Sequence, residues 1–129
     1  MVGYHPTMNH FAILAGAVYC ALAVAAGAFG AHGLADRLDP RGLELWETAS
    51  RYLMYAGLGL LATGILDLSW QSRPLAVAAW ALAFGGLVFS GTVFALALGG
   101  PRILGAVTPL GGLGLILGFL AIAWAAVTR

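Results

Sequence analysis

The stretch Phe11–Leu34, FAILAGAVYCALAVAAGAFGAHGL, contains 24 residues and no charged side chain. A helix of this length measures roughly 36 Å at about 1.5 Å per residue, enough to cross the roughly 30 Å hydrocarbon core of a bilayer with some tilt. No Lys or Arg precedes the run, and it is too long for the apolar part of a signal peptide, so we interpret it as a retained transmembrane helix. Met1 and Met8 both fit as the first residue.

The composition of the whole chain also indicates a membrane protein. Of its 129 residues, 61% are hydrophobic and 9% are charged, whereas a soluble domain carries about a quarter charged residues. Three more apolar runs follow, and all are continuous, which is typical of helices and not of barrel strands. The sequence therefore predicts an all-α membrane protein with one integral membrane domain over residues 1–129. We expect a bundle of four transmembrane helices with short loops, at 11–34, 43–66, 74–98 and 103–127.

The second expected helix has an amphipathic entrance. Asp39 followed by Pro40 is a good helix start, because the carboxylate can cap free amides and proline fits the first helical position. Glu47 and Arg51 share one stripe of this entrance, four residues apart in the order that favours an ion pair. Trp46 lies on another stripe. We expect the entrance to lie near the lipid headgroups, with Trp46 as an interfacial anchor.

The arginines predict an orientation. Four lie on one side of the expected membrane and two on the other: Arg37, Arg41, Arg51 and Arg102 against Arg73 and Arg129. Cytoplasmic loops carry the excess of basic residues. The sequence therefore predicts a multi-pass protein of the cell inner membrane with both termini on the same, outer side. The formal net charge of +1 gives no reason to expect nucleic acid as a partner.

Nineteen glycines indicate close helix packing. In a soluble helix each would cost about 0.8–1.0 kcal/mol relative to alanine, but in lipid small residues let helices approach one another closely. Ala23, Gly27 and Ala31, for example, recur every four residues on the first helix. These seams serve either within one protomer or between protomers. The predicted packing residues are Gly27, Gly30, Gly33, Gly86, Ser90, Gly114 and Gly118.

Few polar residues inside the expected spans could carry chemistry. His32 lies near the end of the first span, where a histidine either faces the bundle interior and binds a proton or ligand, or bonds headgroups and backbone. Pro109 frees the carbonyl of Gly105, so we expect a kink there, with Thr108 bonding a nearby carbonyl. This segment is either a ligand site or simple packing geometry. The candidate polar-site residues are His32, Glu47, Arg51, Tyr52, Thr108 and Pro109.

No catalytic, metal or cofactor site is predicted. His5 and His10 lie at the other end of the first span from His32, so no histidine pair has a metal-ligand or haem spacing. The single cysteine, Cys20, has no partner in the chain. No carboxylate occurs in the middle of the first, third or fourth run, which disfavours a proton-coupled transporter. We therefore expect neither an enzyme activity nor a cofactor.

Four segments in order resemble one family of small membrane proteins: Gly27–Leu34, Trp46–Ala49 with Tyr52, Phe89–Thr92 and Leu104–Gly112. On these motifs the chain resembles, from Met8 onward, the family catalogued as domain of unknown function 423 (transmembrane protein 256-like). The resemblance implies four membrane helices and supplies no established activity. Family members typically have a glutamine and a histidine where this sequence has Leu53 and Ala56. A family site that combined this histidine with His32 would be half lost here.

Two classes of function fit these observations. The small-residue seams and short loops favour a structural or accessory module that self-associates or joins a larger membrane complex. The alternative is a carrier or binding module for a lipid, quinone or other apolar small molecule, with His32 and Thr108–Pro109 lining its site. An enzyme that acts on a membrane lipid through His32 and Glu47 is the least favoured interpretation.

Overall fold

The computed structural model describes residues 6–128, which form four long helices and no strand. They are α1 (Pro6–His32), α2 (Pro40–Trp70), α3 (Arg73–Ala97) and α4 (Leu104–Thr128). Each helix is long and apolar enough to cross a membrane, which confirms the predicted class and number of spans. Met1, His5 and Arg129, which enter the expectations above, lie outside the described residues.

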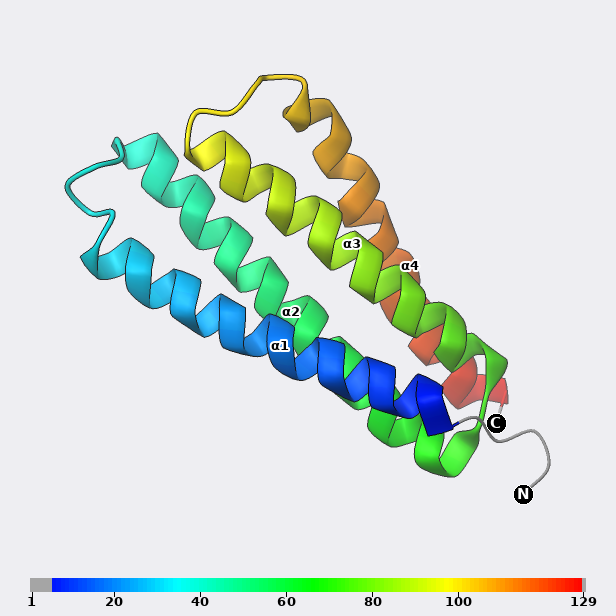
Figure 1. Ribbon diagram of the computed structural model, residues 1–129. Helices are drawn as coiled ribbons and strands as arrows, with labels where there is room; N and C mark the ends of the chain where they lie inside the picture. Colours follow the sequence, from blue (N-terminus) through cyan, green and yellow to red (C-terminus); the bar gives the residue numbers. More distant parts are fainter. Residues whose placement is uncertain (1–5, 129) are drawn as a thin grey trace.

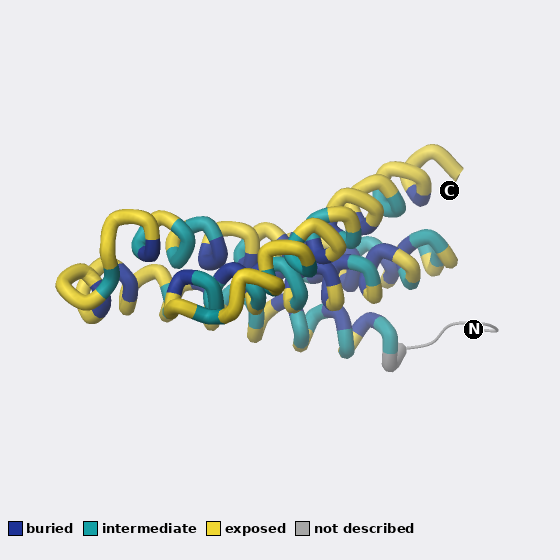
Figure 2. Tube along the Cα trace, turned by 90° about the horizontal axis from the view of Figure 1, so that it is seen from above, coloured by how far each residue is buried: buried dark blue, intermediate teal, exposed yellow. Residues whose placement is uncertain are grey.

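The helices follow one another in an antiparallel row, and the start of α1 and the end of α4 lie at the same end of the molecule (Figure 1). The central pair, α2 and α3, packs on both sides, whereas α1 packs mainly on α2, and α4 mainly on α3. Within residues 6–128, α1 and α4 do not contact each other. The bundle is therefore open at two edges, and α1 and α4 are its most exposed helices (Figure 2).

The entrance of α2 begins where the sequence predicts, and its tryptophan contacts two other helices. Asp39 Oδ1 accepts the amide of Gly42 at 2.7 Å and caps the helix. The indole nitrogen of Trp46 donates to the carbonyl of Ala26 in α1 at 2.7 Å. Its ring meets Phe94 of α3 edge-on, with centroids 4.6 Å apart. Trp46 thus joins α2 to both neighbours, and its place at the level of the headgroups stays a prediction.

The end of α2 lies beyond its predicted position at residue 66. The helix continues to Trp70, and the expected loop at 67–73 shrinks to Gln71 and Ser72. Gln71 adopts a left-handed conformation, with φ of 46°, and its amide donates to the carbonyl of Asp67 at 3.0 Å. This cap reverses the chain within two residues, so α3 starts beside the end of α2.

The connection from α3 to α4 contains a glycine in a conformation that other residues avoid. Gly99 has a φ of 93°, in the left-handed region that other residues avoid.

Helix α4 runs unbroken through Pro109, at the position of the expected kink. Thr108 Oγ1 donates to the carbonyl of Leu104 at 2.9 Å. It also lies 2.6 Å from Thr92 Oγ1 of α3, and either hydroxyl can be the donor of that hydrogen bond. The expected contact of Thr108 with a nearby carbonyl is present, and the two threonines join α3 to α4.

Small apolar residues and interhelical hydrogen bonds hold the helices together. The hydroxyl of Tyr19 in α1 donates to the carbonyl of Ala83 in α3 at 2.5 Å, and Ser90 Oγ in α3 donates to the carbonyl of Ala49 in α2 at 2.9 Å. Burying apolar surface between helices gains little in lipid, so such bonds and close backbone packing contribute more there. The central cluster of buried residues is Ala12, Ala56, Leu60, Ala79, Leu82, Ala83 and Leu115.

Candidate functional site

The predicted packing residues divide into two groups. Five lie where helices touch: Gly30 against Trp46, Gly86 against Ala56, Ser90 against Ala49, Gly114 against Gly85 and Gly118 against Leu82. Gly27 and Gly33 make no such contact. A Cβ added at Gly27 would have nothing within 4 Å, and one at Gly33 would meet only Phe29 of the same turn. Among residues 6–128, these two glycines therefore make no close contact with another helix.

The predicted polar-site residues do not form one site. His32 is exposed at the end of α1 and, among residues 6–128, has no hydrogen bond or ion pair. Thr108 and Pro109 belong to α4, which α1 does not contact within the described part of the chain. A ligand site lined jointly by His32 and Thr108–Pro109 is therefore not assembled within one chain. The reason is the open row, which separates the first helix from the last.

The expected ion pair between Glu47 and Arg51 is also absent from the described residues. Instead, Arg51 Nη2 lies 3.5 Å from Thr48 Oγ1. Both charges are exposed, and an exposed pair gains little because solvent screens it while the side chains lose freedom. Tyr52 points to a different neighbour, since its ring packs on Phe89 of α3 with centroids 4.7 Å apart. Aromatic packing thus accounts for its position.

Glu47 does line a cleft where the end of α1 meets the entrance of α2. The cleft has a volume of about 310 Å³, and its walls are Gly27, Gly30, Ala31, Leu43, Trp46 and Glu47. Two motifs that are distant in the sequence, the Gly-Ala stretch of α1 and the Trp-Glu pair of α2, therefore face one another. Among the lining residues only Glu47 is charged, and His32 is not one of them.

The two positions at which the resemblance implies a departure from the family pattern lie inside the bundle, away from His32. Leu53 and Ala56 are both buried. A Cβ on the adjacent Gly57 would lie 3.0 Å from the amide nitrogen of Cys20 in α1. Position 56 of α2 therefore lies near Cys20 along the length of the bundle. About 18 Å of helix separates Cys20 from His32 at 1.5 Å per residue. A side chain at position 56 is therefore too far from His32 to share a small site with it.

A buried polar pair that was not predicted from the sequence joins α1 to the end of α2. Asn9 Nδ2 donates to Asp67 Oδ2 at 3.0 Å and to the carbonyl of Gly64 at 3.1 Å. The second carboxylate oxygen of Asp67 accepts the amide of Ser72 at 3.1 Å. Asn9 is 1% and Asp67 6% exposed. The sequence does contain a signal for the burial of Asp67. Asp67 lies three residues after Gly64 and seven after Leu60, which places it on the same buried face of α2.

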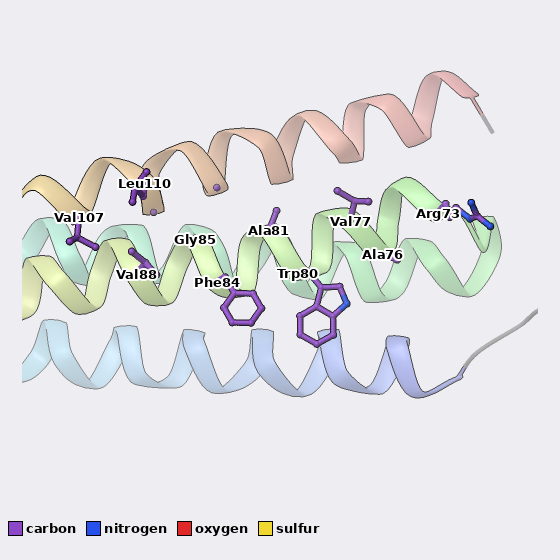
Figure 3. Close-up of a pocket in the computed structure, with 12 residues that line it drawn as sticks. Arg73, Ala76, Val77, Trp80, Ala81, Phe84, Gly85, Val88, Val107 and Leu110 are labelled. Atoms are coloured by element: carbon purple, nitrogen blue, oxygen red, sulfur yellow. The ribbon is translucent and has the colours of Figure 1, made fainter.

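A wide apolar groove runs between α3 and α4 on one face of the molecule (Figure 3). Its volume is about 700 Å³. The backbones touch at glycines, because a Cβ on Gly85 would lie 2.9 Å from the carbonyl oxygen of Gly111. The groove is lined by Arg73, Ala76, Val77, Trp80, Ala81, Phe84, Gly85 and Val88 of α3 and by Val107, Leu110, Gly111 and Gly114 of α4. The sequence shows these residues but not which face of α3 a neighbouring helix leaves open.

Four long apolar helices in an antiparallel row, with polar side chains bonded between helices, define a multi-pass helical membrane protein. The family described as "Protein of unknown function (DUF423)" matches residues 26–112. The chain belongs to this family, which confirms the resemblance seen in its motifs.

Similar proteins are found in several bacteria. A UPF0382 membrane protein of Staphylococcus epidermidis is 46% identical over 110 residues, which cover 85% of this chain and 89% of the relative. That of Staphylococcus saprophyticus is 47% identical over 108 residues, covering 84% and 89%. The UPF0382 membrane protein YwdK of Bacillus subtilis is 40% identical over 116 residues, covering 89% and 94%. No solved structure matches the chain. The protein is thus a membrane protein embedded in a lipid bilayer.

Proposed function

We propose that the protein is a non-catalytic membrane module that associates laterally, with a second copy or within a larger membrane complex, through the outward face of α1. The observation that carries this proposal is an exposed stripe of small residues on an open edge of the bundle. Its members are Ala17, Ala21, Ala28 and Ala31, all exposed and all on one face of the helix. Helix α1 packs mainly on α2, and that contact leaves this face uncovered.

Small side chains on a face that contacts lipid favour helix association. Lipid tails are as apolar as leucine, so helices associate through close backbone approach and not through apolar burial. Two larger exposed side chains, Leu14 and Val24, lie on the same face of the helix as the alanines. The small residues between them would let a second helix approach the backbone of α1 closely. Gly27, which has open space around it, lies beside this stripe, on the wall of the cleft toward α2.

The dispersal of the reactive side chains supports a non-catalytic role. His32 is exposed and stands outside the cleft that Glu47 lines. Within residues 6–128, no three His, Cys, Asp or Glu side chains lie together in a way that could hold a metal ion. The inner membrane is the location that the arginine distribution supports, with both termini on the outer side.

Native mass spectrometry of the full chain in lipid nanodiscs tests the association. We expect dimers or larger particles for the wild type. Ala21→Leu should raise the dissociation constant about tenfold or more, because about 1.4 kcal/mol of lost packing has this effect. The matched control is Ala123→Leu, which makes the same change at an exposed position of α4. A wild type that is strictly monomeric and carries no partner protein contradicts the proposal.

A further inference from the structure

We infer that the α3–α4 groove binds one acyl chain of a lipid with an anionic headgroup, and that Arg73 holds this headgroup. The groove lies on helices other than the one proposed for lateral association. The inference therefore stands on its own observations: the length of the groove, its lining, and one unpartnered charge at its end.

The length of the groove suits an acyl chain that lies along α3. Arg73 and Val88 mark its two ends on this helix, and 15 residues of helix span about 22 Å at 1.5 Å per residue. One acyl chain extends through half of the hydrocarbon core, or about 15 Å. The groove therefore accepts a whole chain and leaves several ångströms at the Arg73 end for the headgroup region.

The lining is apolar, and aromatic packing fixes one of its sides. Trp80 stacks on Phe11 of α1 with centroids 4.9 Å apart, and on Phe84 at 5.7 Å. Figure 3 shows the rings of Trp80 and Phe84 on the side of α3 that faces α1, whereas Val77 and Ala81 lie on the side that faces α4. A stacked ring does not need to be ordered when a ligand binds, which lowers the entropic cost of binding.

The middle of the groove is made of small residues. Ala81, Gly85 and Gly114 line it there, so nothing larger than a methyl group projects from these positions. An acyl chain can lie against this surface. The lining therefore accepts an acyl chain, and the choice of a lipid over a helix of a second copy depends on the charge at the end of the groove.

The charge at the end of the groove selects the headgroup. Arg73 is exposed, and among residues 6–128 it has no hydrogen bond or ion pair. No acidic residue lines the groove, and the carboxylate of nearby Asp67 is already bonded to Asn9 and Ser72. Arginine binds phosphate through two parallel hydrogen bonds, and the start of α3 is the positive end of its helix dipole. A headgroup with net negative charge complements this end better than a zwitterionic one.

Native mass spectrometry of the full chain from phosphatidylcholine nanodiscs with a minor fraction of phosphatidylglycerol tests the inference. The wild type should retain one phosphatidylglycerol per chain in preference to phosphatidylcholine. Arg73→Gln should reduce this preference about tenfold, as expected for the loss of a charge-assisted hydrogen bond. Arg102→Gln is the matched control, because Arg102 is also exposed but lies at the opposite end of the helices. It should keep the preference.

A second variant tests the groove itself. Ala81→Trp fills its middle and should abolish retention of both lipids, while the circular dichroism spectrum shows that the helices persist. Where this variant does not fold, the two arginine variants decide the inference by themselves. Equal loss in both arginine variants overturns it, as does unchanged lipid retention in Arg73→Gln. It is also overturned if Ala81→Trp dissociates a dimer and leaves lipid retention unchanged, since a second copy would then occupy the groove.

Discussion

Asn9 and Asp67 close the end of the bundle where α1 begins and α2 ends. Each is almost fully buried, and their hydrogen bond connects residues that are 58 positions apart in the chain. An unpaired polar group in an apolar interior is costly, so each side chain satisfies the other. The carboxylate also accepts the amide of Ser72 and thereby fixes the turn into α3.

Replacing Asn9 should therefore destabilise the protein measurably. Asn9→Ala leaves the Asp67 carboxylate with one partner fewer, and a lost hydrogen bond to a charged group costs about 1.5–3 kcal/mol. The free energy of unfolding in detergent, measured by circular dichroism, should fall by about this amount. His10→Ala, at the neighbouring exposed position, should change it by less than about 0.5 kcal/mol. Equal effects of the two substitutions would sink the assignment of this pair.

The glycines of α1 show what a sequence can and cannot predict for single residues. Gly27 and Gly30 belong to one motif, yet only Gly30 lies against Trp46. Successive residues are about 100° apart around a helix, so spacing gives the relative positions of the small residues but not which of them faces a neighbour. His32 was singled out by its chemistry, and its surroundings depend on the same unknown rotation.

Whole helices were easier to predict than their ends. Four apolar runs gave four helices, because the thickness of the hydrocarbon core sets the length of each. The start of α2 was also predictable, since the Asp39 cap is a local signal. Its end was not, because it depends on the left-handed Gln71 and on the burial of Asp67 against Asn9, which is a tertiary contact. The α3–α4 groove could not be predicted for a similar reason: it depends on which helices are neighbours.

Two adjacent glycines of α4 provide a sharp test of the α3–α4 contact. A Cβ on Gly111 would lie 2.8 Å from the Cα of Phe89, so the backbone of α3 would have to move. A Cβ on Gly112 would lie 3.6 Å from the ring of Phe89, which is an ordinary contact. Gly111→Ala should therefore lower the free energy of unfolding by about 1–3 kcal/mol through overpacking. Gly112→Ala should be neutral or raise it by up to about 1 kcal/mol, since alanine favours helix.

Thermal unfolding of the two variants in the same detergent makes this comparison. Both substitutions add one methyl group to the same turn, so a difference between them reports the approach of α3 and not helix propensity. Equal melting temperatures would show that α3 and α4 do not meet at Gly111.

The open row of helices connects the separate observations at the scale of the whole molecule. Because α1 and α4 do not touch within the described residues, each has a face that lipid or another protein must cover. The uncovered face of α1 carries small residues. The uncovered face of α4 borders the apolar groove. The proposed association uses α1, whereas the proposed lipid site uses α3 and α4.

The arginines of this row predict its orientation in the membrane. Arg37, Arg41 and Arg102 lie at the end opposite to Arg73, and Arg51 lies in the half of α2 nearer to that end. The positive-inside rule therefore predicts that this end faces the cytoplasm. In a Cys20→Ala background, we expect Thr128→Cys to react with a membrane-impermeant maleimide in right-side-out vesicles. Pro101→Cys, exposed at the opposite end, should react only in inside-out vesicles. The reverse pattern would invert the orientation, and it would move the Arg73 end of the groove, with its lipid headgroup, to the cytoplasmic leaflet.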